Sequence, residues 1–328
     1  MKKSIISLAV LASMVASSAA LAEPKVYGNV HLSINDVDSA DNVDMTSNTS
    51  SIGVKGSEDL GDGMKAIYKV EFQMDPANGG AANDNNDEGT NGNALTNRDQ
   101  FVGLKGGMGT IKFGSMSSNY KQMGGKVDSL YRTRLEGRGF LNTQSRLHNG
   151  RATNRGRMTD QVQYASPKMS GFQLVANTTF SGADDETVGA GIRWANKSIT
   201  AYLDFIDTVP GGGSVSANNT ESAIKVGGKF KTKAFRVAGQ FESAEDLTGF
   251  NYIHVNGGFN INKNNSIEAT FGTASHINNS NLDTTSFAVA YNHKMSKKTN
   301  VYVGYGDRSS DVDANDDTLF TAGIRKKF

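Results

Sequence analysis

Apolar and polar residues alternate with a period of two along almost the whole chain after residue 25. In the segment 26–34, Val26, Val30 and Ile34 fall on one face, while Asn29 and His31 fall on the other. Such alternation predicts a β-strand with one apolar and one polar side. The same pattern recurs at 49–59, 64–74, 98–106, 110–117, 158–166, 171–181, 186–196, 198–207, 220–231, 233–243, 250–262, 265–274, 283–293, 299–307 and 318–328.

The connections between these segments alternate between short and long. The short ones contain Gly, Asn or Asp, which supply the positive φ angles that tight hairpins need. The long ones are polar and lie at 36–48, 75–97, 118–157, 182–185, 208–219, 244–249, 275–282 and 308–317. Each predicted strand is close to the roughly 10 residues that a tilted strand needs to cross a bilayer. The sequence therefore predicts an all-β fold, a 16-stranded antiparallel transmembrane β-barrel.

The third long connection, 118–157, differs from the others. Long connections such as 36–48, 75–97, 182–185 and 308–317 are acidic, and the short turns are rich in lysine. Residues 119–157 carry Lys121, Lys126, Arg132, Arg134, Arg138, Arg146, Arg151, Arg155 and Arg157 against only Asp128 and Glu136. Because a structureless loop of this length is uncommon unless it has a function, we expect it to fold inward and to narrow a water-filled channel. A basic helix or a nucleic-acid-binding patch is the alternative interpretation of the same charges.

The N-terminus predicts export of the chain. Residues 1–22 combine Lys2 and Lys3, an apolar run and an Ala-Leu-Ala ending, which is typical of a cleaved signal peptide. The remaining residues, 23–328, are predicted to form one barrel domain. The mean hydropathy of −0.44 does not exclude a membrane protein, because barrel strands average apolar and polar positions. The net charge of +1 gives no general argument for nucleic-acid binding, and the absence of cysteine excludes a disulfide framework.

With apolar positions facing outward, cationic side chains gather on the inward face. They are Lys55, Lys65, Lys69, Lys112, Arg193, Lys225, Lys229 and Arg236, against the acids Glu71, Asp204 and Glu268. The pattern around Phe101 leaves the direction of Arg98 open. A barrel this wide keeps an aqueous channel, whose narrowest charges govern passage. The candidate constriction residues are Lys55, Lys69, Arg98, Lys112, Asp128, Arg132, Arg134, Glu136 and Arg138.

Several motifs together resemble one family. The chain resembles the Gram-negative general porins, and more closely their trimeric neisserial and proteobacterial subgroup. The resemblance lies in the mature start EPKVYGNVHLSI, the block NRDQFVGLKGGMGTIKFG, the segment QVQYASPKMSGF and the terminal Phe328. The chain departs from the pattern at Lys326, where many outer-membrane proteins have an aromatic residue. The resemblance implies a homotrimer in the outer membrane, an inward third loop, and a basic wall opposite loop acids, here Asp128 and Glu136.

These observations predict a porin, not an enzyme, for passive diffusion of small hydrophilic solutes and ions, with a preference for anions. A channel specific for phosphate or another anion is an alternative. An outer-membrane hydrolase is a second alternative, although the five histidines lie in no nucleophile–base pattern. An adhesin acting through the acidic loops is a third.

No cofactor site is expected, since Gly106–Gly109 has neither the helix nor the Lys-Ser/Thr of a phosphate-binding loop. Asp311, Asp313 and Asp317 resemble the start of a calcium loop. Asp316 stands where that loop needs glycine, and Ala322 where it needs glutamate. A solvated acidic loop is therefore favoured, with divalent cations shared with lipopolysaccharide as the alternative. The expected partners are outer-membrane lipids, lipopolysaccharide, ions and small solutes, and not nucleic acid.

Overall fold

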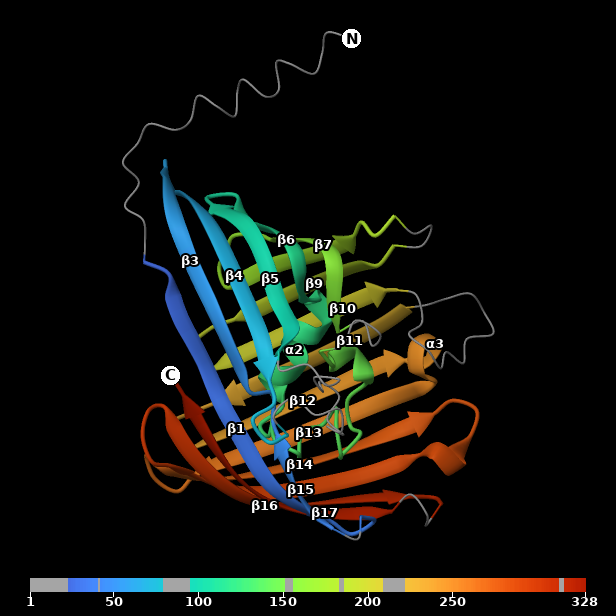
Figure 1. Cartoon of the computed structure of the whole chain (residues 1–328). Coiled ribbons are helices and arrows are strands. Elements are labelled where there is room, and N and C mark those ends of the chain that lie inside the picture. The colour runs from blue at the N-terminus through green and yellow to red at the C-terminus, as the bar shows by residue number, and fades with distance from the viewer. Residues whose placement is uncertain are drawn as a thin grey trace.

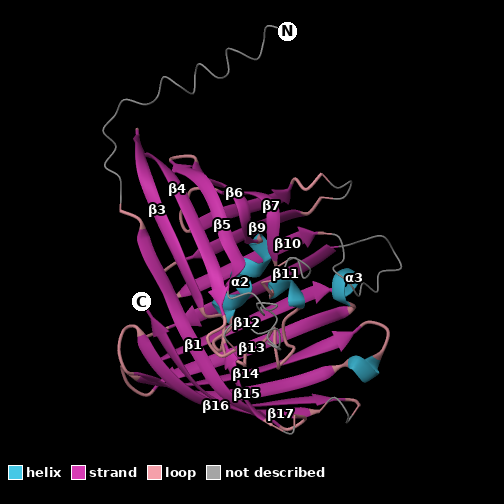
Figure 2. Cartoon of the chain, in the orientation of Figure 1, coloured by secondary structure: helices cyan, strands magenta, loops and turns pink. Residues whose placement is uncertain are grey.

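The computed structural model describes residues 23–40, 42–78, 95–150, 156–182, 186–208, 222–312 and 316–328. Within these ranges the chain forms seventeen strands, joined in one sheet in which every pairing is antiparallel (Figures 1 and 2). The strands are β1 (Lys25–Val37), β2 (Val43–Ser47), β3 (Ser51–Gly61), β4 (Met64–Met74), β5 (Leu95–Gly106), β6 (Gly109–Ser117), β7 (Arg157–Ala165), β8 (Phe172–Thr179), β9 (Val188–Ala195), β10 (Ile199–Asp207), β11 (Ser222–Lys231), β12 (Phe235–Ala244), β13 (Phe250–Asn260), β14 (Asn265–His276), β15 (Thr284–Lys294), β16 (Thr299–Ser310) and β17 (Asp317–Lys327).

The sheet closes on itself because the first and last strands pair. The β1–β17 register runs from Asn29↔Lys327 to Val37↔Leu319. Both β2 and β3 pair with β1, so these two strands together take one position in the wall. The described strands therefore occupy sixteen positions, which confirms the predicted 16-stranded antiparallel barrel. The predicted second strand, 49–59, is displaced by two residues from β3, and Thr49 in the break has a left-handed φ of 58°.

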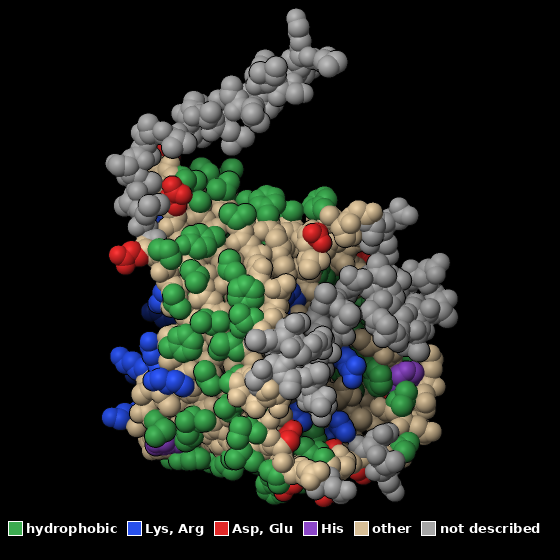
Figure 3. Space-filling model, in the orientation of Figure 1, with side chains coloured by type: hydrophobic (Ala, Val, Ile, Leu, Met, Phe, Trp, Pro, Cys, Tyr) green, Lys and Arg blue, Asp and Glu red, His purple; other side chains and the backbone are tan. Residues whose placement is uncertain are grey.

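The alternation in the sequence corresponds to the inside and outside of the barrel. On β1, the side chain of His31 is 2% exposed, and Asn29 and Ser33 are buried with it. On the opposite face, Ile34 is 52% exposed, and Val26 is exposed as well. Apolar side chains cover much of the visible outer surface (Figure 3). This inverted arrangement, with apolar residues outside and polar residues inside, is the one that a lipid environment stabilises.

The tight turns have the predicted chemistry. The β3–β4 turn contains Asp62 and Gly63 with φ angles of 48° and 73°. In the β7–β8 turn, Ser170 and Gly171 have φ angles of 50° and 91°. The sequence located these hairpins correctly because positive φ angles restrict the choice of residue.

In the described part of the chain, four short helical segments lie between the strands. They are α2 (Asn119–Val127), the 3₁₀ turn η1 (Arg146–His148), α3 (Glu245–Thr248) and the 3₁₀ turn η3 (Ser280–Leu282). No helix in the described part of the chain is long and apolar enough to cross a membrane. α3 directly follows the end of β12, whereas α2 lies within the ring of strands (Figure 2).

The helix α2 corrects the expectation that 118–157 lacks secondary structure. Ser118 caps the helix, because its Oγ accepts the N–H of Lys121 at 3.2 Å. Tyr120, Met123 and Val127 form a buried stripe at helical spacing. The sequence analysis did not predict this helix, because Gly124 and Gly125 disfavour helical structure. Glycine is required at 124, because a Cβ there would lie 2.3 Å from Nδ1 of His148.

Candidate functional site

The segment from Asn119 to Asn149, called the inner loop below, is hydrogen-bonded to strand residues of the inner wall. Asn119 Nδ2 donates to the carbonyl of Ala190 at 2.8 Å and to Oδ1 of Asp204 at 3.1 Å. Asn256 Nδ2 donates to the carbonyl of Val127. The far end of the loop is held as well, since Arg308 donates to the carbonyl of Phe140 at 3.2 Å. These contacts join the loop to β9, β10, β13 and β16.

Apolar packing reinforces these hydrogen bonds. Leu135 and Leu141 are fully buried in a cluster with Ala288 and Ala290 of β15. Position 306 of β16 also needs a small residue, because a Cβ on Gly306 would lie 2.5 Å from Cδ2 of Leu135. Small residues on the inner face of β15 and β16 thus form the surface on which the loop leucines are buried.

A buried polar contact joins η1 to β12. Glu242 accepts the backbone N–H of Ser145 at 3.0 Å and approaches Nε2 of His148 at 3.2 Å. Burial, together with the positive charge of Lys225, lowers the pKa of His148 to about 4, although Glu242 opposes the shift. The imidazole is therefore neutral near pH 7.

The two loop acids bind within the loop. Asp128 accepts the backbone N–H groups of Leu130 at 2.8 Å and Gly137 at 2.9 Å. Glu136 accepts the N–H of Arg132 at 2.8 Å and Nε of Arg138 at 2.7 Å. Burial raises the pKa of Glu136, and Arg138 partly offsets the increase. These contacts differ from the expected role opposite a basic wall, because both carboxylates satisfy backbone donors of the loop's own turns.

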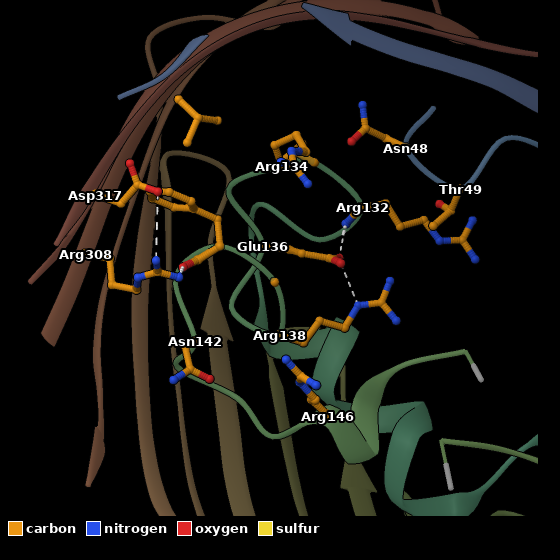
Figure 4. A pocket seen from close by; sticks show the side chains of 14 residues that line it. Asn48, Thr49, Arg132, Arg134, Glu136, Arg138, Asn142, Arg146, Arg308 and Asp317 are labelled. Atoms are coloured by element: carbon orange, nitrogen blue, oxygen red, sulfur yellow. Dashed lines mark hydrogen bonds and ion pairs between the residues drawn. The ribbon is translucent and has the colours of Figure 1, made fainter. Parts of the chain in front are cut away.

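Two of the cavities that border the inner loop are lined by many charged residues, one toward the long connections and one toward the tight turns. The first, about 400 Å³, is called the loop-side cavity (Figure 4). Its charged lining is Arg132, Arg134, Arg138, Arg146, Arg308, Glu136 and Asp317. The second, about 530 Å³, is called the turn-side cavity. Its charged lining is Asp99, Lys112, Lys121, Lys126, Arg132 and Arg325.

Arg132 lines both cavities. Its φ of 68° is left-handed, a conformation that costs a non-glycine residue roughly 1–2 kcal/mol. The bond from its N–H to Glu136 and the position of its guanidinium, 5.6 Å from the centre of the Tyr131 ring, hold this turn in place. Arg132 is thus the predicted residue that the structure places between the two water-accessible spaces.

The wall cations Lys69 and Arg98 belong to one ion-pair cluster. Lys69 Nζ lies 3.1 Å from Glu71 and 2.9 Å from Asp99. Arg98 Nε lies 2.7 Å from Glu71, and Arg157 Nε lies 3.1 Å from Asp99. Three cations against two carboxylates leave this cluster with a net charge of +1.

A β-bulge explains why the sequence did not decide the direction of the Arg98 side chain and did not identify Asp99 as an inward residue. The register shifts between Val70↔Gln100 and Phe72↔Asn97, so Glu71 faces two residues of β5. A bulge of this kind breaks the alternation of inward and outward side chains. Both Arg98 and Asp99 therefore reach the same inner cluster.

Lys55 and Lys112 have no carboxylate partner among the described residues. Lys55 Nζ lies 4.9 Å from the centre of the Tyr27 ring. Lys112 Nζ donates to Gln163 at 2.8 Å and lies 5.0 Å from the Phe101 ring.

Arg325, near the end of β17, was not identified from the sequence as a channel residue, although it is two residues from Gly323 on a strand of clear alternation. Its Nε donates to Asn29 at 3.1 Å, and it lines the turn-side cavity with Arg132.

Three of the other predicted inward cations donate hydrogen bonds to the inner loop, whereas Lys65 pairs with Asp59 of β3 at 3.7 Å. Arg193 donates to Gln122 at 2.9 Å, and Lys229 donates to the carbonyl of Lys126 at 2.6 Å. Arg236 reaches the carbonyl of Ser129 at 3.4 Å. Their inward direction was predicted, and their bonding to the loop was not.

No metal site is found among the described residues. Asp317 accepts the N–H of Ser39 at 3.0 Å and lies 3.9 Å from Arg308. Asp311 is in the described turn after β16, and Asp313 lies outside the described residues, as do residues 1–22.

A closed β-barrel with apolar residues outside and polar, charged cavities inside defines a channel-forming outer-membrane protein. The family model for the Gram-negative porin matches residues 7–313, and the chain belongs to this family. An outer membrane porin protein of Bordetella pertussis is 25% identical over the full length of both chains. Major outer membrane protein P.IB of Neisseria gonorrhoeae is 27% identical over 259 residues, covering 74% of this chain and 68% of that protein. These relatives are channels of the outer membrane and not enzymes.

Solved structures agree on the fold. An anion-selective porin from Comamonas acidovorans has a TM-score of 0.73 at 18% identity, covering 94% of this chain and all of that one. The trimer form of OmpT from Vibrio cholerae has a TM-score of 0.67 at 14% identity, covering 94% and 99% of the two chains.

Proposed function

We propose that this porin conducts small hydrophilic solutes and ions by passive diffusion with a preference for anions. Residues 1–22 act as a cleaved export signal, and the 118–157 connection forms the constriction within the 23–328 barrel. The observation that carries the proposal is the lining of the turn-side cavity, where Lys112, Lys121, Lys126, Arg132 and Arg325 accompany the single acid Asp99.

The excess of positive charge is larger around the turn-side cavity than in the wall cluster of Lys69, Arg98, Arg157, Glu71 and Asp99. Asp99 already interacts with Lys69 and Arg157, so it offsets little of the charge of Arg132 and Arg325. The carboxylates of Asp128 and Glu136 are largely buried and accept hydrogen bonds from donors of the inner loop itself, so they offset little of this charge. An anion passing between the cavities thus meets guanidinium groups from the loop and from β17.

The assembly proposed here is a homotrimer in contact with outer-membrane lipids and lipopolysaccharide. The trimer form among the structurally similar porins supports this state.

Reversal potentials in planar bilayers under a tenfold KCl gradient test the anion preference. The wild-type protein is expected to favour chloride at low salt, and the preference shrinks at 1 M salt, where the screening length falls to about 3 Å. Arg132→Gln and Arg325→Gln each reduce the anion-to-cation permeability ratio by up to about five-fold, the equivalent of roughly 1 kcal/mol for a charge about 4 Å from a hydrated ion.

Arg193→Gln is the matched control, because it removes the same charge from a side chain that binds the inner loop. It is expected to change selectivity less than either variant of the cavity. A wild-type channel that prefers cations at low salt overturns the proposal. Conductance that saturates with phosphate instead identifies a channel specific for that anion.

A further inference from the structure

Six of the exposed lysines at the tight-turn end of the strands from β11 to β17 are called the lysine rim below. They are Lys233, Lys263, Lys294, Lys297, Lys298 and Lys326, and all are exposed. No Asp or Glu occurs in 229–236, 259–266, 292–299 or 324–328. Within the described chain, no ion pair neutralises these lysines, and Lys326 donates to the hydroxyl of Thr299 at 3.2 Å. The rim is therefore a patch of one sign.

The tight turn between β3 and β4 has a different character. The β3–β4 hairpin carries Glu58, Asp59 and Asp62, and Asp59 pairs with Lys65 at 3.7 Å. The β3–β4 hairpin thus differs from the tight turns of β11–β17, which carry lysine and no acid. Figure 3 shows Lys and Arg side chains gathered at the left edge of the barrel, the side on which Figure 1 places the C-terminus.

An apolar row runs beside the lysine rim on the outer surface. The strand registers pair Phe235↔Phe259, Phe259↔Ile267, Ile267↔Tyr291 and Tyr291↔Val303. The row is continuous across five strands, and each of these side chains is more than one-third exposed. Aromatic and aliphatic residues in this position mark the boundary between hydrocarbon and headgroups.

The spacing between row and rim fits the depth of a headgroup. Lys233 is two residues from Phe235, Lys294 is three from Tyr291, and Lys263 is four from Phe259. At about 3.4 Å per residue along a strand, the lysine Cα atoms lie at most roughly 7–14 Å beyond the row. Long lysine side chains at this level keep the ammonium group in water while the methylenes follow apolar surface.

We propose that the lysine rim and this row bind anionic glycerophospholipids in the leaflet at the tight-turn side, which is the periplasmic leaflet in bacterial barrels. The acyl chains contact the row, and the phosphates contact the ammonium groups. A soluble anion or a sugar polymer would use the lysines alone. An amphiphile uses both features, and the continuity of row and rim across β12–β16 favours it.

The folded protein, extracted from bilayers containing equal parts of phosphatidylcholine and phosphatidylglycerol, tests this proposal. Native mass spectrometry counts the lipids that stay bound. The wild type is expected to retain phosphatidylglycerol preferentially, and 1 M salt during extraction removes the preference. In the variant with Lys263, Lys294, Lys297 and Lys298 all changed to Gln, retention falls at least ten-fold, since one lysine near an anionic surface contributes up to about five-fold.

The matched control changes Lys25, Lys105, Lys168 and Lys197 to Gln, which removes the same charge from other positions at the same end of the barrel. This control is expected to retain most of the phosphatidylglycerol. Circular dichroism and heat-modifiable gel migration verify that both variants are folded. An equal loss in both variants would show that only net charge matters and would overturn the proposal. Retention of both lipids in equal amounts by the wild type would overturn it too, as would displacement of the lipid by peptidoglycan fragments.

Discussion

The two halves of the barrel wall use the same residue types for different purposes. On β9, β11 and β12, the inward cations Arg193, Lys229 and Arg236 donate to carbonyl or amide oxygens of the inner loop. On β3 and β6, Lys55 and Lys112 face the lumen beside aromatic rings. The strands of both halves alternate in the same way. An inward lysine or arginine is therefore not by itself a selectivity residue, since its role depends on whether a loop covers it.

The covered half also shows why the loop stays in place. Its inner face has small residues where the loop leucines pack, such as Ala288 and Gly306. The open half has instead the ion-pair cluster of Lys69, Arg98, Arg157, Glu71 and Asp99. Three changes to the chain or its solution would break or sharpen this contrast.

Removal of the apolar contacts has the largest expected effect. Leu135→Ala with Leu141→Ala deletes two fully buried side chains, each at a cost of about 2–5 kcal/mol. The loop would leave the covered wall, and single-channel conductance would rise with much greater current noise. Leu60→Ala, an exposed residue of the β3–β4 turn, is the control that leaves conductance unchanged. A double variant with wild-type conductance would show that hydrogen bonds alone hold the loop.

Acidification is expected to have an intermediate effect on docking of the loop. Docked His148 is neutral down to about pH 4, while an undocked imidazole takes up a proton below about pH 6.5. Between these values the undocked state binds more protons, so docking weakens as pH falls, by at most about 3 kcal/mol at pH 4. Current noise should therefore increase from pH 7 to pH 4.

The groups around His148 are Glu242 of β12, Lys225 of β11, and Tyr120 and Lys121 of α2. His148→Gln removes the titrating group and keeps a polar side chain. This variant should lose the pH dependence of the noise between pH 6.5 and pH 4. The same pH dependence in the variant would assign it to another group.

Neutralising a single wall carboxylate gives the smallest expected effect. Glu71→Gln changes the net charge of the open-half cluster from +1 to +2 and should raise the anion preference by less than about five-fold, because the lumen is hydrated and screened within about 8 Å. Glu268→Gln, whose carboxylate pairs with Arg236 at 2.5 Å in the covered half, is the control. Reversal potentials that shift equally in both variants would contradict the distinction between the halves.

Much of the barrel could be predicted from residue order. Strand alternation depends on local geometry, since successive side chains point to opposite faces and lipid selects the apolar one. For this reason the segment 64–74 matches β4, and tight turns such as Asp62–Gly63 were found from their positive φ angles. The inward direction of Lys55, Lys69 and Lys112 follows from the same alternation.

The site was only partly predictable. Alternation fails at the bulge opposite Glu71, so Arg98 was left open and Asp99 was missed. The stripe of Tyr120, Met123 and Val127 was hidden, because Gly124 disfavours a helix in isolation and is tolerated only where His148 packs against it.

The sequence by itself determined the closed wall, the direction of most side chains and the unusual charge of the 118–157 connection, because each depends on neighbours along the chain. The tertiary structure alone decided that Asp128 and Glu136 hold the loop's own turns, that Arg193 binds the loop, and that Arg132 and Arg325 share one cavity. The last two of these roles depend on pairs of residues far apart in the chain. Their proximity comes from the closure of the barrel and the path of the loop, which no local pattern encodes.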